Sequence, residues 1–529
     1  MKKRLSFSLV AMLGLAMAFF SCQDLDTENL NSPDESRALA TGSDIESLVG
    51  GSFLSWFQAI SSSTPNMSLA MASDTYTCGW GNFSMWRMDQ EPRQEFGNTS
   101  SSPERGVIEN PWFGLYGAIS AASDGIRNIE NGTVDLGAAN NTRAIAFGKL
   151  VQGLSHGYIA TMFDQGFILD EDVDLANDEL TLQPYNAVLD AAIAQLQECI
   201  DLSGSTTFTL PIEWINGVST SNEDLARIAH TFIARYKVVV ARNPQERAAT
   251  DWATVLSHVD RGLTDDWGPI GDGAGRSSQW YDGVQWYSSQ YGTWQRVDYR
   301  LIGPSDRSNG YADWGSRAPA DRQEFEMDTG DLRIWDQTRD MDGNQNPGTQ
   351  MSFAGPTAYN GGRPYIACMY GHDRFTEYAT TDAATQVVMY RASEADFIRA
   401  EAALNGVGGG EAEAAALLDQ THVVDGGYPS LAGVAKGTIN DLPDPKPESR
   451  TLWSALKYER RMDLLGTFSG LQLWDGRGYG ILTSGTPIHF PVPALDLEVL
   501  QLELYSHGGG KGDSAPKARR VFDGALKAN

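Results

Sequence analysis

The chain has 529 residues, of which 41% are hydrophobic and 20% are charged. This length and composition fit one large globular domain or two to three ordinary ones, and they exclude a globally disordered chain. The formal net charge is -28, and no segment forms a basic stripe. Because such a surface repels phosphate backbones, the sequence excludes nucleic acid as a partner.

The first residues have the pattern of an export signal. Three basic residues precede an apolar run over 5–20, which is too short to span a bilayer. The run ends at Ser21, a small residue before a lone cysteine, as bacterial lipoprotein processing requires. We therefore predict a signal peptide over 1–21 and lipidation of Cys22, although Phe19 replaces the usual leucine. The alternative is an ordinary secretory peptide with an incidental cysteine.

Helices are predicted over most of the remaining chain. Residues 22–43 are polar and rich in turn formers, so we expect a lipidated tether there, and Asp44 is the candidate N-cap of the first helix. Apolar residues then recur at intervals of three and four. The predicted helices cover 44–57, 112–129, 142–162, 184–202, 222–241, a short stretch from 251, 393–405, 410–423, 449–465 and a short stretch near Val521.

The long helix over 142–162 contains three glycines, Gly148, Gly153 and Gly157, within its apolar stripe. Each glycine costs a helix about 1 kcal/mol relative to alanine. Their presence is explained if neighbouring helix backbones approach closely at these positions.

Residues 265–390 lose helical periodicity and become rich in Gly, Asp, Trp and Tyr. We therefore predict a mainly α fold in which paired helices stack as a solenoid-like layer, interrupted by one long irregular region. The expected parts are an N-terminal helical part over 44–262 and an irregular insert with a C-terminal part over 263–529. Together they form one structural unit.

The remaining cysteines and acids give no metal or redox motif. Three cysteines, Cys78, Cys199 and Cys368, cannot pair completely, so buried free thiols are favoured over one disulfide bridge. The segment from Asp340 to Asn344 begins like a calcium loop, but the later ligand positions are wrong, and a turn is expected. No zinc spacing, nucleophile elbow or phosphate loop is present, so we predict no metal, no cofactor and no catalytic residue.

Five segments carry recognisable patterns. They are a Trp…Leu-Tyr…Ile helix at 112–120, a glycine-containing helix running into Phe163 and Gly166, Glu-Ala…Ala-Glu-Ala at 393–402, Glu-Arg-Arg followed by Trp-Asp-Gly-Arg at 459–477, and Phe-Pro-Val-Pro at 490–493. In this order, behind a lipidation signal, they resemble the SusD/RagB family of outer-membrane glycan-binding lipoproteins.

The resemblance implies a right-handed superhelix of tetratricopeptide-like helix pairs with a loop-rich irregular face. It also implies that the protein binds an oligosaccharide at the cell surface and acts as a lid on a SusC-like TonB-dependent outer-membrane transporter. It would break no bond. Asp24 and Asp26, just after Cys22, resemble the surface-export signal of Bacteroidetes-type lipoproteins. A lipid-anchored protein facing the cell exterior is therefore expected.

Sugars stack on flat aromatic surfaces, with a few polar groups fixing their orientation. Two aromatic segments in Gly/Ser/Asn-rich loops fit this chemistry, and the resemblance places the family's glycan platform in corresponding loops. The predicted ligand-binding residues are Trp80, Asn82, Trp86, Arg87, Trp280, Tyr281, Trp286, Tyr287 and Trp294, with Asp74 and Gln285 as further rim candidates. Alternatively, these side chains fix the loops onto the helical layer or contact the transporter.

Two other functions remain open. The same scaffold could bind peptides or another nutrient. A secreted glycoside hydrolase needs two carboxylates about 5 to 10 Å apart. We interpret Glu394 and Glu401, seven apart on one helix face, as structural, and the Glu459-Arg460-Arg461 run as part of a salt-linked helix.

Overall fold

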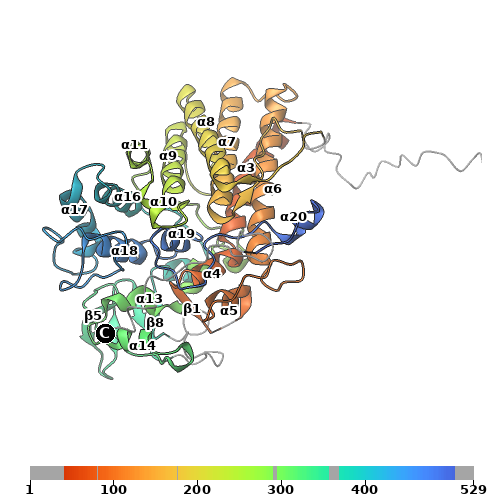
Figure 1. The fold of residues 1–529 in the computed structure, drawn as a ribbon. Helices are drawn as coiled ribbons and strands as arrows, with labels where there is room; N and C mark the ends of the chain where they lie inside the picture. Colours follow the sequence, from red (N-terminus) through yellow and green to blue (C-terminus); the bar gives the residue numbers. More distant parts are fainter. Residues whose placement is uncertain (1–40, 80, 175–176, 290–294, 357–367, 507–529) are drawn as a thin grey trace, which may run out of the picture.

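The computed structural model describes residues 41–79, 81–174, 177–289, 295–356 and 368–506. Cys22, Trp80, Trp294 and the helix predicted near Val521 lie outside these residues. Five long helices run side by side, each packed against the next (Figure 1). They are α3 (Gly42–Ser61), α6 (Gly106–Glu130), α7 (Ala138–Met162), α8 (Tyr185–Ser205) and α9 (Asn222–Val239).

The helical layer continues beyond α9 with helices that come from both sides of the irregular region. Neighbours in this part are α11 (Trp252–Val259), α16 (Ser393–Leu404), α17 (Gly410–His422) and α18 (Leu452–Asp463). The short helices α10 (Pro244–Ala248) and α19 (Leu471–Gly478) contact each other, and α20 (Ala494–Val499) lies beside α6 (Figure 1). The predicted mainly α fold of stacked helix pairs with a loop-rich face is therefore confirmed. Within the described residues, no helix combines the length and apolarity needed to cross a membrane.

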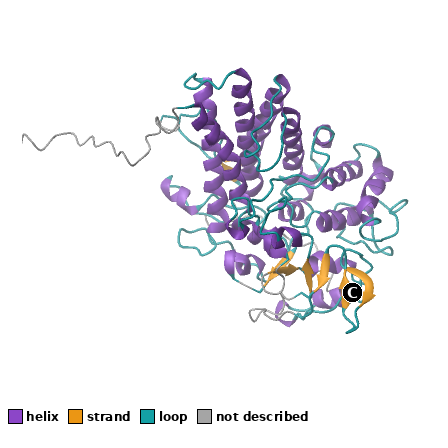
Figure 2. Ribbon diagram, turned by 180° about the vertical axis from the view of Figure 1, so that it is seen from behind, coloured by secondary structure: helices purple, strands orange, loops and turns teal. Residues whose placement is uncertain are grey.

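The loop-rich part of the molecule contains short helices and two-stranded sheets, and Figure 2 shows most of the strands at one end, whereas β2 (Gln165–Gly166) and β3 (Gln183–Pro184) lie beside α7 and α8. The short helices are α4 (Ser63–Ala72), α5 (Met85–Asp89), α12 (Gly283–Ser288), α13 (Tyr299–Ile302), α14 (Gly310–Ser316) and α15 (Thr376–Thr380). The antiparallel pairs are β1 (Tyr76–Cys78) with β4 (Gln295–Val297), β2 with β3, β5 (Trp335–Arg339) with β6 (Gln345–Pro347), and β7 (Met351–Phe353) with β8 (Tyr370–His372). Sequence periodicity could not identify elements this short.

The N-cap of the first long helix lies three residues earlier than predicted. Thr41, rather than Asp44, is its N-cap, and the Thr41 hydroxyl accepts a hydrogen bond from the Asp44 amide. The Asp44 carboxylate in turn accepts one from the Thr41 amide, which completes a capping box.

The glycines of α7 lie where other helices approach, as predicted. A Cβ atom at Gly153 would lie 2.5 Å from Leu196 of α8, and one at Gly157 would lie 2.2 Å from the Tyr236 ring of α9. The Tyr236 hydroxyl also donates a 2.8 Å hydrogen bond to the Leu154 carbonyl. Glycine is therefore needed for the close packing of α7 against its neighbours.

The three cysteines of the described residues, Cys78, Cys199 and Cys368, are buried and form no disulfide. Burial raises the pKa of the Cys199 thiol to about 12, against a hydrogen bond with Ser203 that lowers it. The expectation of buried free thiols is confirmed.

Buried ion pairs attach α16 to the helices that precede the irregular region. On α16, Glu394 pairs with Arg235 of α9 at 2.6 Å, and Glu401 pairs with Arg247 of α10 at 2.7 Å. All four side chains are at most 1% exposed. The structural interpretation of Glu394 and Glu401 is therefore confirmed.

The Glu-Arg-Arg segment of α18 takes part in the same kind of pairing. Arg460 binds Asp475 of α19 at 2.7 Å, and Glu459 binds Arg333 at 2.6 Å and His422 at 2.8 Å. Burial would raise the pKa of Glu459, but the Arg333 guanidinium and the His422 hydrogen bond outweigh it and lower that pKa to about 2. These residues hold the fold together.

The surroundings of Gly157 and Gly117 predict that substitution by alanine has opposite effects on stability at these two positions. Gly157→Ala should lower the free energy of unfolding by about 1–3 kcal/mol, because its methyl group overlaps the Tyr236 ring. Gly117→Ala, on the exposed side of α6, meets no atom within 4 Å and should raise it by up to about 1 kcal/mol. Denaturant unfolding measures both, and equal effects would contradict the packing argument.

The Glu459 carboxylate predicts a loss of stability in acid. Since its folded pKa of about 2 lies below the ordinary value of 4.5, its contribution is complete above pH 4.5 and is lost as the pH falls toward 2. The shift corresponds to about 3 kcal/mol. Glu459→Gln should lower the free energy of unfolding at neutral pH and flatten its dependence on pH below 4.5. The exposed control Glu213→Gln should do neither, and an unchanged pH dependence in Glu459→Gln would refute the assignment.

Candidate functional site

An open groove of about 760 Å³ lies between α3, α6 and the loop before α12. Tyr281, one of the predicted ligand-binding residues, lines it and is half-buried. Phe113 of α6 lines it as well, and 45% of its surface is exposed. Two aromatic rings therefore face one hollow, as a sugar site requires.

Amide side chains supply the polar groups of the groove. Gln58 on α3, Asn110 on α6 and Gln279 on the loop all line it and are exposed. Gln58 Nε2 donates a 3.1 Å hydrogen bond to the Gln279 carbonyl, which attaches the loop to α3. An amide offers both a donor and an acceptor to a ligand hydroxyl group.

Two glycines of α6 shape the floor of the groove. A Cβ atom at Gly114 would lie 2.7 Å from the Ala59 methyl group, so α3 and α6 are in close contact there. At Gly117 an added Cβ atom would meet nothing within 4 Å, so this part of the groove is open space. Substituting Gly117 would therefore fill the groove without displacing a neighbour.

Glu109 is the carboxylate of the groove. The residue is 9% exposed, and its Oε1 atom is buried without a hydrogen-bond partner among the described residues. Its Oε2 atom lies 3.6 Å from Nε of Arg105. Burial raises the pKa of Glu109, and the Arg105 charge opposes this.

Three of the predicted aromatic residues are packed inside the protein. Trp280 is 5% exposed and lies against Phe53 and Phe57 of α3, with ring centroids 6.1 and 5.3 Å apart. Trp286 is 9% and Tyr287 2% exposed. Protein atoms cover these rings, and Trp280 fixes the loop on α3, so their role in ligand binding stays a prediction that this conformation does not favour.

The two rim candidates also have structural contacts. The buried Gln285 amide donates hydrogen bonds to the carbonyls of Val388 and Gly466, at 2.9 and 3.1 Å. Asp74 is buried in an ion pair with Arg93 at 2.5 Å. Neither side chain lines the groove, although Asp74 lines a second cavity.

The predicted residues of the first aromatic segment keep part of their surface. Asn82 is exposed, and Trp86, on α5, is half-buried. Arg87 is half-buried but donates to Glu104 at 2.9 Å and to the Glu95 carbonyl at 2.8 Å, so it holds the following loop against α5. A ligand role for Asn82 and Trp86 stays a prediction.

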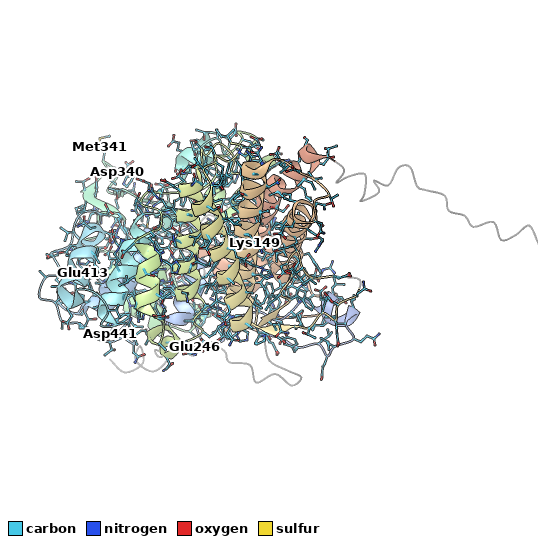
Figure 3. The ribbon with its side chains drawn as sticks, turned by 90° about the horizontal axis from the view of Figure 1, so that it is seen from above. Lys149, Glu246, Asp340, Met341, Glu413 and Asp441 are labelled. Atoms are coloured by element: carbon cyan, nitrogen blue, oxygen red, sulfur yellow. The ribbon has the colours of Figure 1, made fainter. Side chains whose placement is uncertain are left out.

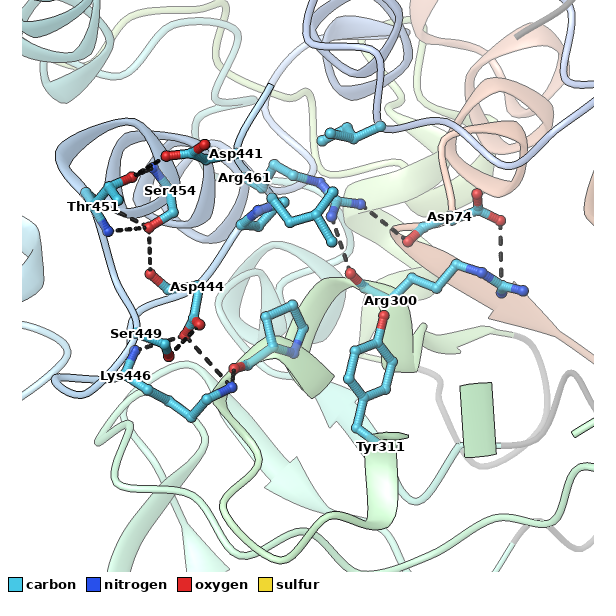
Figure 4. A pocket seen from close by; sticks show the side chains of 14 residues that line it. Asp74, Arg300, Tyr311, Asp441, Asp444, Lys446, Ser449, Thr451, Ser454 and Arg461 are labelled. Carbon is cyan, nitrogen blue, oxygen red and sulfur yellow. Dashed lines mark hydrogen bonds and ion pairs between the residues drawn. The ribbon is translucent and has the colours of Figure 1, made fainter. Parts of the chain in front are cut away.

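A second cavity, of about 530 Å³, lies between α14 and the 441–454 segment before and within α18 (Figure 4). Its polar groups are largely paired with one another. Lys446 Nζ donates to the Pro304 carbonyl at 2.7 Å, and Arg461 Nη1 donates to the Arg300 carbonyl at 3.0 Å. A polar ligand would have to break such contacts. We therefore place the candidate site in the groove.

The segment that begins like a calcium loop forms the turn between β5 and β6. Asp340 Oδ1 accepts hydrogen bonds from the backbone amides of Asp342 and Asn344, at 2.9 and 2.8 Å. Asp340 and Met341 lie at the edge of the molecule in Figure 3. The predicted turn is confirmed, and no three metal-ligating side chains of the described residues are arranged to hold an ion.

Sequence comparison finds no relative, because no protein-family model and no curated protein matches the chain significantly. Solved structures do match. A SusD superfamily protein from Bacteroides thetaiotaomicron is 14% identical with a TM-score of 0.52, covering 88% of this chain and 98% of that one. One from Bacteroides vulgatus is 11% identical with a TM-score of 0.53, covering 86% and 96%. The chain therefore has the fold of SusD superfamily proteins, as the motifs imply.

Proposed function

We propose that this protein is a cell-surface glycan-binding lipoprotein that captures an oligosaccharide in the groove between α3 and α6. The observation that carries the proposal is the combination of the Phe113 and Tyr281 rings with three amide side chains in one open hollow. The SusD-like fold supports the same function. In this role the protein delivers its ligand to a SusC-like TonB-dependent transporter, over which it acts as a lid.

The rings and amides of the groove complement the two faces of a sugar. The C–H face of a pyranose packs on an aromatic ring, while its hydroxyl groups need both donors and acceptors. Tyr281 is held in place by a 3.2 Å hydrogen bond between its hydroxyl group and that of Ser63, at the start of α4. A ring fixed before binding loses little conformational entropy when the ligand arrives.

The groove favours binding over hydrolysis. Glycoside hydrolysis uses two carboxylates that flank the scissile bond. Among the residues that line the groove, Glu109 supplies one carboxylate and no other residue supplies a second. A ligand held there would be released unchanged, as delivery to a transporter requires.

Filling the groove should weaken glycan binding without unfolding the protein. Gly117→Leu places a side chain in the open space of α6 and should weaken retention on a glycan affinity gel at least about tenfold. Phe113→Ala removes one stacking face, worth about 1 kcal/mol or about fivefold in affinity. Gly204→Leu, at an equally open position on α8, is the matched control and should bind normally.

Retention that is unaffected by Gly117→Leu would exclude the groove as the site. Retention of peptides instead of glycans would favour the peptide-binding alternative.

The anchor is tested separately. Cys22→Ser removes the thiol that would be acylated and should move the protein from the membrane fraction to the soluble fraction, without loss of glycan retention. Fractionation followed by detergent phase partitioning measures this. A Cys22→Ser variant that stays in the membrane fraction would show that Cys22 is not the anchor.

A further inference from the structure

We infer that the groove selects neutral and amino-bearing glycans and rejects glycans that carry carboxylate or sulfate groups. This inference rests on the proposed function, since it names the class of sugar bound at the same groove. It follows from the charges that line the groove and from those that are missing there.

The lining of the groove contains one acidic residue and no basic one. Glu109 is joined there by amides, hydroxyl groups, glycines, an alanine and the two rings, and none of the lining residues is Lys, Arg or His. An anionic sugar would lose hydration on entering and would find no cation to replace it. Glu109 would also repel it. The lining therefore opposes anionic ligands on two independent grounds.

Arg105 offsets the charge of Glu109 only in part. Its Nε atom lies 3.6 Å from Glu109 Oε2, which is too long for a hydrogen bond, and half of the Arg105 side chain is exposed. Arg105 also donates a 2.7 Å hydrogen bond to the Ser100 carbonyl. Water therefore weakens the interaction of a ligand with Arg105 more than its interaction with the nearly buried Glu109 carboxylate.

The nearby loop adds a second acidic group. The backbone amide of Gln279 donates a 3.1 Å hydrogen bond to the carboxylate of Asp272, which is exposed. Arg276, on the same loop, donates to the Tyr287 hydroxyl at 3.2 Å and does not line the groove. Asp272 does not line the groove either, so Glu109 is the charged group that acts directly on a ligand there.

An ammonium group would improve the environment of Glu109. Glu109 lines the groove, its Oε1 atom accepts no hydrogen bond from a described residue, and Arg105 lies 3.6 Å from Oε2, so the carboxylate is incompletely compensated. Burial raises the pKa of Glu109, and a cation bound beside it would lower that pKa again by stabilising the charged form. Amino sugars therefore gain an interaction that neutral sugars lack.

The test is a glycan array carrying neutral, amino-bearing, uronic-acid and sulfated oligosaccharides, probed with the full mature chain. We expect retained glycans to be neutral or amino-bearing, with binding of acidic ones at least tenfold weaker. Glu109→Gln should reduce the ratio of amino-bearing to acidic binding by about three- to tenfold. Glu130→Gln removes the same charge from the far end of α6, about 30 Å away, and should leave the ratio unchanged.

The possible failures differ from one another. Acidic glycans retained as strongly as neutral ones would overturn the inference and leave the proposed function standing. The same holds for a ratio that Glu109→Gln and Glu130→Gln change equally. If no glycan of any class is retained, the proposed function fails and this inference fails with it.

Discussion

The stacked helices depend on arginine–carboxylate pairs that are buried between them. Removing a charged group from water costs several kcal/mol, so a buried arginine needs acceptors at hydrogen-bond distance, and at the contacts between α9, α10, α16, α18 and α19 carboxylates supply them. Arg247 meets this condition with Glu401 and Asp475, which come from helices more than 150 residues further along the chain. A misplaced helix would leave a charge unpaired in the interior, at a cost of about 3–5 kcal/mol. The pairs therefore specify which helices are neighbours, in addition to stabilising the arrangement.

The long helices could be predicted from the sequence because their apolar spacing is local, and the glycines of α7 even indicated where neighbours approach. The partners of Glu394 and Glu401 could not be predicted. Their arginines lie more than 150 residues away, and no local pattern joins them. Residues whose sequence motif suggests catalysis, such as Glu459, form ion pairs in the interior of the protein. Their resemblance to a family pattern reflects the fold more than the ligand.

The candidate site was only partly predictable for a similar reason. An aromatic residue in a polar loop looks exposed in a sequence, yet Trp280 lies against two phenylalanines of α3. Phe113 shows the reverse case: it sits beside the buried Trp112 in a helix, and only the position of α3 reveals that its ring faces outward into a groove. The exposure of a side chain depends on the residues that lie close to it in space. Tyr281 is predicted from the sequence and also lines the groove in the structure, because the loop passes directly from the buried Trp280 to the groove.

The buried thiols, none of which forms a disulfide, bear on how the chain reaches its native state. With its pKa raised to about 12, the Cys199 thiol stays protonated at physiological pH, and a protonated thiol is a poor nucleophile in disulfide exchange. Cys78 and Cys368 are enclosed as well. Folding of the described part of the chain therefore needs no oxidant and no isomerase to sort its cysteines. The stability of the folded domain should therefore be the same under reducing and oxidising conditions.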